Sequence, residues 1–446
     1  MSAAVFAIGL GLLVAHSSAV AALALVAAPP IAYVLTKSQG GLALGLILVL
    51  VLPYWLTLGT AQASVLRVGS AAAAVTLLVT RRFRLTFVDC ALVVLVAVIV
   101  LGWLFQYDQP HVGRVVTIEL TPLGFYFGAR ALPQNRVQNV MSVALFAGTV
   151  GALTVLYEFL QGQPVFIDPS QYVWNATDSS VFRPGGIFGS PPGAATVLCF
   201  VILFGIAYVT NVRGWKRLLT VGCLGICSVT LVTTLTRGGI IGLSVGIVVF
   251  LWLLRSPLLR PLRVAWFAFA VGLVIFVVLP TFQHSSTFQQ AVVRPGNLAA
   301  RESFWKEALP IATANGHNFV FGVGTGTLET PVVANDVGVP AQLAEAPDLV
   351  QNSLHNQYVT TLFEQGAIGV GALLLFLLAA LLPAARAARR TASPTHAALA
   401  ASIVAVAIVM TVDTVLLHGP SFAMIMITAG LAATLSRVPP LDSAGR

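Results

Sequence analysis

His355 is the residue of this chain best placed to do chemistry. It follows a polar stretch that runs roughly from 281 to 354, and an apolar run long enough to cross a membrane comes directly after it. Asn356 is its neighbour, and Tyr358 lies three residues on, which predicts that the two rings share a helix face. A neutral imidazole accepts protons, so the position suits a general base at a membrane–water boundary. On spacing alone, a structural histidine bonded to a neighbouring helix or loop is the alternative.

Three arginines are predicted to lie on the same side of the membrane as this histidine. Arg237 lies in a short turn between two apolar runs, Arg183 precedes a turn rich in glycine and proline, and Arg301 lies in the polar stretch. A guanidinium group binds phosphate through its planar fork of donors, so these residues suit an anionic substrate. The alternatives are a turn residue that reaches lipid head groups, for Arg237, and a solvated helix face, for Arg301.

The predicted direction of three helices favours an anion at the same place. Helices that begin near Ser190, Gly238 and His355 all present their N-terminal ends to the outer side. Such ends carry N–H groups without helical partners and a partial positive charge. Convergence of the three ends, which would build an anion site from backbone and arginine, is a hypothesis.

The composition requires an integral membrane protein. The 446 residues are 57% hydrophobic and 9% charged, with a mean hydropathy of +0.91, whereas soluble domains are about a quarter charged. Unpaired backbone is not tolerated in lipid, and the sequence lacks the alternating pattern of a membrane β-barrel. We therefore predict an all-α, polytopic membrane protein that forms a single membrane domain over 1–446.

Apolar runs near the length of a membrane helix, about 20 residues, recur along the chain. We identify fourteen and expect twelve to fourteen helices, because the first run is short. The N-terminus lacks the basic residues of a cleaved signal peptide, so the first run is expected to be retained. The runs lie near 3–15, 19–36, 40–57, 64–80, 86–105, 115–132, 137–160, 190–211, 216–235, 238–254, 263–280, 361–385, 395–415 and 419–436.

The basic residues set the expected orientation. Most Lys and Arg residues fall in loops on the same side as the N-terminus, and the positive-inside rule places that side in the cytoplasm. Both termini are then cytoplasmic, while a smaller loop at 161–189 and a large loop at 281–354 face outward. The net charge of +9 mostly reflects this topology, and no basic–aromatic patch indicates nucleic acid binding.

The large loop is predicted to contain a helix and a tight turn. Residues 297–314 read as a helix on which Arg301 and Trp305 are four residues apart and share a face. Gly322 and Gly324 then form a glycine-rich loop ahead of the next membrane helix.

Neither a metal site nor a cofactor is expected. The sequence has no paired carboxylates and no His, Cys and Asp cluster with metal-ligand spacing. The four cysteines fall inside apolar runs and are expected to be small buried residues. Acidic residues near these runs, such as Glu158, Glu364 and Asp413, are scattered and form no proton relay. No phosphate-binding motif faces the cytoplasm, which argues against a nucleotide-sugar donor.

The residues that follow the large loop resemble the C-terminal motif of the O-antigen ligase family, part of a broader group of polysaccharide ligases and polymerases. That motif is His, then Asn, Ser or Gln, nine residues, Gly, two residues, and Gly, Thr or Tyr. His355, Asn356, Gly366 and Gly369 satisfy every position.

Other features of that family also have counterparts here. The family carries an arginine at an outer helix turn, which Arg237 resembles, and another in its long loop, which Arg301 resembles. A Gly-x-Gly follows the second arginine, as Gly322 and Gly324 do here. The specific motifs lie between about 180 and 370, within a likeness that spans most of the chain.

The resemblance implies an inverting, metal-independent glycosyltransferase of the GT-C type in the bacterial cytoplasmic (inner) membrane, at work in cell-envelope polysaccharide biosynthesis. The donor would be a glycan on polyprenyl (undecaprenyl) pyrophosphate, and the acceptor a hydroxyl on a glycan, glycolipid or protein at the periplasmic face. His355, Arg301 and Arg237 would be catalytic. The residues expected to bind substrate are Arg183, Trp305, Gly322, Gly324, Asn356 and Tyr358.

Three other functions stay open. A Wzy-type polymerase would catalyse the same chemistry, but such polymerases often have two large outer loops with Arg-x10-Gly patterns. In this chain only one predicted loop is large. No glycine stands eleven residues after any of the outer arginines. A solute transporter would place its polar residues near the midplane of the membrane, whereas these candidates cluster at the rim. An inert scaffold of an export complex would tolerate the loss of His355.

Overall fold

Most of the residues that the structure describes are in helices. In this computed structural model those residues are mostly helical and contain no β-strand, and six helices are long and apolar enough to cross a membrane. The all-α, polytopic class predicted from the sequence is confirmed. The described residues are 85–104, 122–166, 182–254, 305–325 without 307, and 355–435 without 418.

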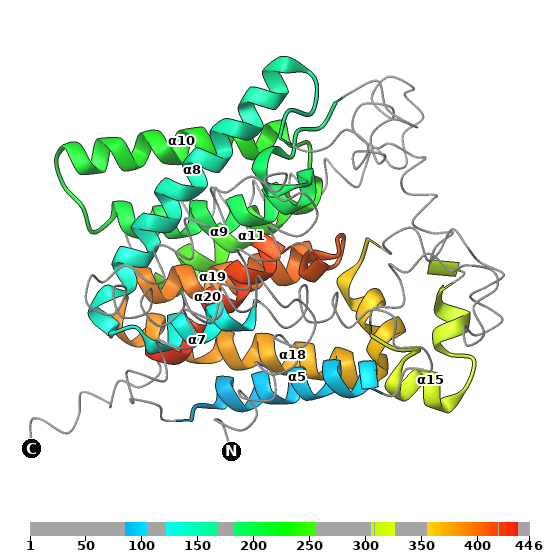
Figure 1. Ribbon diagram of the computed structural model, residues 1–446. Helices are drawn as coiled ribbons and strands as arrows, with labels where there is room; N and C mark the ends of the chain where they lie inside the picture. Colours follow the sequence, from blue (N-terminus) through cyan, green and yellow to red (C-terminus); the bar gives the residue numbers. More distant parts are fainter. Residues whose placement is uncertain are drawn as a thin grey trace, which may run out of the picture.

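Ten α-helices lie within these ranges, and most of them run side by side in one bundle (Figure 1). Their bounds are α5 Phe87–Leu104, α7 Leu123–Ala131, α8 Val137–Gln161, α9 Pro191–Val209, α10 Trp215–Thr233, α11 Arg237–Leu254, α15 Gly316–Phe321, α18 Gln357–Thr391, α19 Pro394–Val409 and α20 Gly419–Leu435. Short 3-10 turns cover Gln134–Arg136, Gly186–Phe188 and Val415–Leu417.

Most helices follow the predicted apolar runs, because length and hydropathy alone define a membrane span. Two runs differ. The run at 115–132 contributes only the nine residues of α7 to the described part of the chain. The run at 361–385 belongs to α18, which begins four residues earlier and has a non-helical backbone at Gly366 (φ 67°).

The number of membrane helices stays a prediction. The runs before residue 85 and the run at 263–280 lie outside the described residues. The division into a membrane domain with loops at 161–189 and 281–354 likewise stays a prediction, since most of both loops falls outside them.

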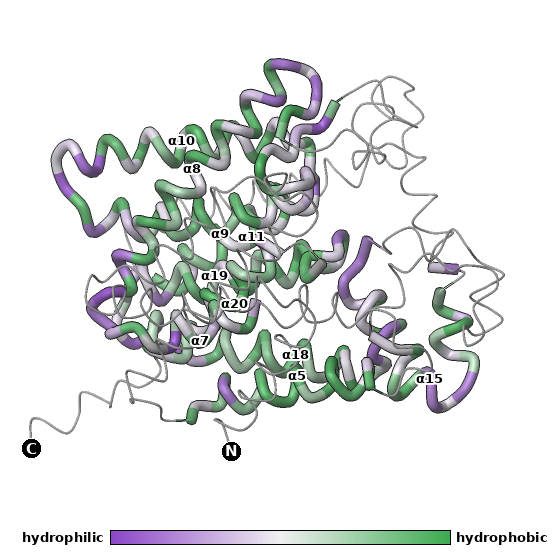
Figure 2. The backbone as a smooth tube through the Cα atoms, in the orientation of Figure 1, coloured by the Kyte–Doolittle hydropathy of each residue, from purple (hydrophilic) through white to green (hydrophobic). Residues whose placement is uncertain are grey.

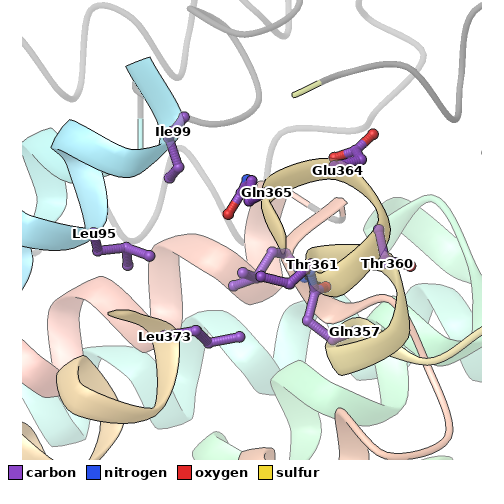
Figure 3. Close-up of a pocket in the computed structure, with 9 residues that line it drawn as sticks. Leu95, Ile99, Gln357, Thr360, Thr361, Glu364, Gln365 and Leu373 are labelled. Carbon is purple, nitrogen blue, oxygen red and sulfur yellow. Dashed lines mark hydrogen bonds between the residues drawn. The ribbon is translucent and has the colours of Figure 1, made fainter. Parts of the chain in front are cut away.

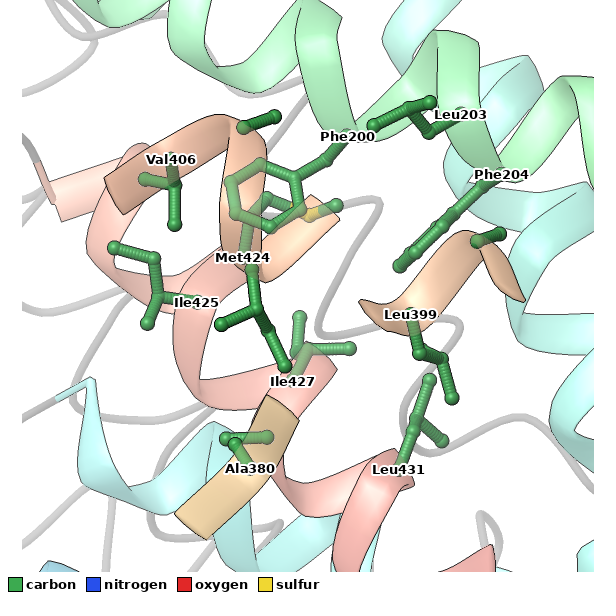
Figure 4. Packing of buried hydrophobic residues seen from close by; sticks show 14 of the residues in the cluster. Phe200, Leu203, Phe204, Ala380, Leu399, Val406, Met424, Ile425, Ile427 and Leu431 are labelled. Atoms are coloured by element: carbon green, nitrogen blue, oxygen red, sulfur yellow. The ribbon is translucent and has the colours of Figure 1, made fainter. Parts of the chain in front are cut away.

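α20 forms the centre of the bundle. Every residue from Pro420 to Leu435 is buried. Its apolar side chains, Ile427 among them, gather with Phe200 of α9 and Leu399 of α19 in the cluster that Figure 4 shows. At Gly430 an added Cβ would overlap backbone of α7, so only a glycine allows this approach. Small residues at such contacts are how membrane helices pack closely.

The outer surface of the bundle is apolar. On α10, large hydrophobic side chains such as Trp215, Leu218 and Val229 are exposed. Figure 2 shows hydrophobic residues along the helices and hydrophilic residues gathered at their ends and turns. This distribution is that of a protein surrounded by lipid.

One buried ion pair joins α5 to α7. The Arg130 guanidinium donates to Asp89 with Nε–Oδ1 and Nη2–Oδ2 distances of 3.1 and 3.0 Å, and the Tyr126 hydroxyl donates to Oδ1 at 2.6 Å. Both charged side chains are buried. Breaking such a pair is costly because it strands a buried charge, so we assign these residues a role in holding the helices together.

Several connections meet at one end of the bundle. The turn after α8, the turn between α10 and α11, the 410–417 loop between α19 and α20, and the start of α18 all lie at the same end as α15, on the right in Figure 1. Residues far apart in the sequence are therefore neighbours there.

Candidate functional site

His355 is held in an unusual backbone conformation. Its φ is +47°, in the left-handed region that residues other than glycine seldom adopt. It stands two residues before α18, where the Asn356 side chain caps the helix by accepting from the N–H groups of Tyr358 and Val359 at 2.9 and 3.2 Å. A conformation of this kind persists only when its surroundings fix it, and such conformations cluster at functional sites.

The 410–417 loop supplies those surroundings. The Asn356 amide donates to the Thr411 carbonyl at 2.9 Å, and the Gln357 N–H donates to the Met410 carbonyl at 2.8 Å. The Leu416 N–H donates in return to the Gln357 side chain at 2.9 Å. The two residues after His355 are therefore tied to this loop, which fixes the direction of the histidine. Asn356, predicted to bind substrate, acts here as a helix cap and a tether.

Asp413 of the same loop faces the histidine. Its Oδ1 lies 3.9 Å from His355 Nδ1, and the Asp413 side chain is buried while the His355 side chain is 21% exposed. A carboxylate on the Nδ1 side of the ring favours one orientation of the imidazole. The sequence had placed Asp413 among scattered acids. Its position where the apolar runs at 395–415 and 419–436 meet was the signal that it belonged with His355.

Arg237 begins α11 beside this loop. A cation at the N-terminal end of a helix meets the positive end of the helix dipole, which disfavours it energetically unless an anion is present. The neighbouring Gly238 packs so tightly that an added Cβ would overlap the side chain of Val412. Since Val412 precedes Asp413, the Arg237 turn and the histidine contact the same short loop.

Arg183 is bound to the turn that precedes Arg237. Its guanidinium donates through Nε to the Thr234 carbonyl at 3.2 Å and through Nη2 to the Thr236 hydroxyl at 2.9 Å. The structure thus brings Arg183 into the site, but with contacts that position the Arg237 turn. Direct binding of phosphate by Arg183 stays a prediction.

Glu158, at the end of α8, organises the segment that carries Arg183. Its carboxylate is fully buried and accepts four backbone N–H groups. Val165 and Phe166 donate to Oε1, both at 3.0 Å, and Gly185 and Gly186 donate to Oε2 at 3.1 and 2.7 Å. The carboxylate therefore joins both flanks of the smaller loop. From sequence it was only a scattered acid, because its partners are backbone atoms that no motif reveals.

The glycine-rich loop folds against α18. The N–H groups of Val323 and Gly324 donate to the carbonyls of Phe363 and Glu364 at 2.9 and 3.0 Å, at the point where α18 breaks. Gly322 has a φ of +80°, which favours glycine. The predicted tight loop is confirmed, whereas a role in binding substrate is untested.

The aromatic candidates differ in their surroundings. The Tyr358 hydroxyl donates to the Ala407 carbonyl at 2.9 Å, so this half-buried ring is attached to α19. Trp305, also half-buried, precedes the short helical stretch at 308–312, where Ala308 and Ala312 are buried. Part of the helix predicted at 297–314 is thus observed. Arg301 lies outside the described residues, and its place in the site stays a prediction.

A small polar pocket lies in the first part of α18, next to α5 (Figure 3). Its free volume is about 10 Å³, room for a group the size of one water molecule. Five polar residues line it together with apolar ones, and the buried hydroxyl of Thr360 has no hydrogen-bond partner in the described part of the protein. The lining residues are Leu95, Ile99, Gln357, Thr360, Thr361, Glu364, Gln365, Leu373 and Leu416.

Metal ligands do not gather anywhere in the described ranges. No group of three or more His, Cys, Asp and Glu side chains there is arranged to hold a metal ion. The expected metal independence is a statement about the reaction and stays a prediction.

The comparison with protein families gives one match. The family described as O-antigen ligase (Wzy_C) matches residues 222–374. This segment contains Arg237, Trp305, the glycine-rich loop and His355, and it ends within α18. No curated protein matches the chain. The family match confirms the resemblance predicted from the motifs.

Proposed function

We propose that this membrane protein transfers a glycan from polyprenyl pyrophosphate to an acceptor hydroxyl, a proposal that the match of residues 222–374 to the O-antigen ligase family supports. The donor is a glycan linked to undecaprenyl pyrophosphate in a bacterial cytoplasmic membrane, and the acceptor is a glycan, glycolipid or protein. The reaction takes place on the outer face, both termini lie in the cytoplasm, and neither a metal nor a cofactor takes part.

The observation that carries this proposal is the meeting of His355, Asp413 and the Arg237 turn on the 410–417 loop. A ring that accepts a proton, a carboxylate that orients it and a guanidinium at a helix N-terminus are groups that can catalyse glycosyl transfer from a diphosphate. No other part of the described chain combines them.

In the proposed reaction, the acceptor oxygen attacks the anomeric carbon of the donor from the face opposite the pyrophosphate. The new glycosidic C–O bond forms as the C–O bond to the pyrophosphate breaks, with inversion at the carbon. His355 Nε2 takes the hydroxyl proton, and the Asp413 carboxylate at 3.9 Å stabilises the resulting imidazolium. Proton transfer of this kind contributes about 10²- to 10⁴-fold to a rate.

The departing pyrophosphate carries the negative charge that develops in the transition state. Arg237 and Arg301 neutralise that charge, and the first N–H groups of α11 add to the effect. Removing one preorganised donor of this type costs about 10²- to 10³-fold in rate. Arg183 contributes by holding the Arg237 turn through Thr234 and Thr236.

Transfer activity in proteoliposomes tests the proposal. Purified protein is supplied with a polyprenyl-pyrophosphate-linked glycan and candidate acceptors in EDTA, and wild type is compared with His355→Ala and Arg237→Ala. Arg213→Ala, at an exposed position in the turn between α9 and α10, is the matched control.

Loss of product in the two site variants alone, with folding intact, supports the proposal. A single glycan added per acceptor indicates a ligase, and a ladder of products indicates a polymerase. Full activity in both His355→Ala and Arg237→Ala contradicts the proposal.

A further inference from the structure

The segment from Gly322 to Thr325, which we call the strap, closes a break in a membrane helix. α18 departs from helical geometry at Gly366, so carbonyls just before the break lose their partners within the helix. Val323 and Gly324 of the strap donate to two of them, those of Phe363 and Glu364. The strap thus supplies hydrogen bonds that the helix itself does not make.

Glycine is required where the strap crosses α18. Gly366 has a φ of +67°, and a Cβ there would overlap the Val320 carbonyl. Gly322 has a φ of +80°, and a Cβ there would overlap the backbone of Glu364 and Gln365. Each glycine therefore faces the backbone of the residues just before the other glycine, and no larger residue fits at either position.

The other end of the strap is bound to α5. The Thr325 hydroxyl donates to the Ile99 carbonyl at 3.2 Å, and the Thr325 N–H approaches the Gly102 carbonyl at 3.4 Å. An added Cβ at Gly102 would lie 2.8 Å from the Thr325 hydroxyl oxygen and 3.9 Å, an ordinary contact distance, from the Thr325 Cβ and backbone N. The strap therefore bridges α5 and α18, two neighbours in the bundle that Figure 1 shows side by side.

A short chain of hydrogen bonds connects the strap to the helical stretch at 308–312. The Gly322 N–H donates to the Asn318 carbonyl at 2.8 Å, and the Asn318 amide donates to the Ile311 carbonyl at 3.2 Å. The same stretch follows Trp305. One continuous path therefore runs from the loop helix through α15 and the strap to the segment that begins at His355.

We infer that the strap is a positioning element for glycan transfer: it fixes the helix of the large loop relative to the catalytic segment 355–365, and Gly322, Gly366 and Thr325 are positioning residues. The inference rests on the proposed function. A displacement of about 1 Å between reacting groups costs about a hundredfold in rate, so a strap shifted by a few tenths of an ångström lowers kcat and leaves KM nearly unchanged.

A pair of substitutions with built-in rescue tests this inference. Gly102→Ala pushes the Thr325 hydroxyl away, and we expect kcat per folded molecule to fall by about tenfold. Adding Thr325→Ala removes the atom in conflict, so the double variant returns to the activity of Thr325→Ala alone. Gly371→Ala, on α18 with open space around it, is the matched control and keeps wild-type activity.

A distance measurement separates positioning from loss of fold. Spin labels are placed at Ala314→Cys, beside the loop helix, and at Leu378→Cys, on the exposed face of α18 beyond the break, in a chain with Cys90→Ser. We expect one narrow distance distribution in the parent chain. Gly102→Ala shifts or broadens it, and Gly371→Ala does not.

The outcomes of the two measurements are distinct. A tenfold lower kcat with a shifted distance in Gly102→Ala, and no further effect of Gly102→Ala when Thr325→Ala is already present, supports the inference. Unchanged kcat or an unchanged distance in Gly102→Ala overturns it, even when the wild type transfers glycan. An inactive wild type overturns the proposed function instead, and the label distances alone then decide whether the strap sets the position of the loop.

Discussion

The Glu158→Gln substitution probes the buried carboxylate that joins the two flanks of the smaller loop. Glutamine keeps the size and one oxygen of the native side chain, but its NH₂ group replaces the second oxygen and cannot accept hydrogen bonds. Whichever way the amide is turned, two of the four backbone N–H groups now face another donor. Those are either Val165 and Phe166 or Gly185 and Gly186.

The expected loss of stability is large. A buried donor left without an acceptor costs about 1–3 kcal/mol. The less costly orientation of the amide leaves the part-buried N–H groups of Val165 and Phe166 unpaired, so the expected loss is at the lower end for two donors, about 2 kcal/mol. This is a substantial part of the 5–15 kcal/mol, roughly, that holds a typical domain together. The melting temperature is expected to fall by about 4 °C or more. Transfer activity is expected to fall as well, because Arg183, which holds the Arg237 turn, lies two residues before Gly185.

Thermal unfolding of the purified protein in detergent measures the effect. Gln161→Ala, an exposed position one turn further along α8, controls for changes at the helix end. A melting temperature of Glu158→Gln within about 1 °C of both wild type and Gln161→Ala would be well under the shift expected for one unpaired donor. That result would show that the carboxylate does not hold the loop flanks and would refute the reasoning.

Three further predictions concern the histidine and the pocket. Asp413→Asn keeps the shape of the side chain beside His355 but removes its charge, so we expect kcat to fall. The decrease should be smaller than the roughly 10²- to 10⁴-fold decrease expected for His355→Ala. Equal rates in wild type and Asp413→Asn would rule out the orienting role of Asp413. Asn356→Ala removes a helix cap and the bond to Thr411, and thermal denaturation should show a loss of about 1–2 kcal/mol; an unchanged melting temperature would contradict the cap. Thr360→Val replaces a buried hydroxyl without a partner by a methyl group, so stability should stay the same or rise; a clear drop in melting temperature would show that the hydroxyl is bonded in the protein.

The elements could be predicted from the sequence because lipid imposes one simple rule. A helix that crosses a membrane is a run of about 20 apolar residues, and the bounds of α8 and α11 follow from hydropathy alone. The break at Gly366 could not be read in this way. It depends on contact with a glycine-rich loop more than forty residues earlier in the chain, and a hydropathy pattern does not reveal such a contact.

The candidate site was predictable in its residue types but not in its contacts. His355 and Arg237 were recognised from spacing and from the cost of placing an arginine at an outer helix turn. Asp413 and Glu158 were not, since each gains its role from groups supplied by another element. For Asn356 the sequence indicated substrate binding, whereas the observed contacts are those of a helix cap and a tether to the 410–417 loop.

The central claim is that the ring of His355 accepts the acceptor proton during transfer from a lipid-linked donor. Its most direct test is the initial rate of glycan transfer by His355→Ala in EDTA, measured with and without added imidazole. The account predicts a rate at least about a hundredfold below wild type, with partial recovery as imidazole enters the space left by the side chain. A His355→Ala rate equal to that of wild type, unaffected by imidazole, would contradict it.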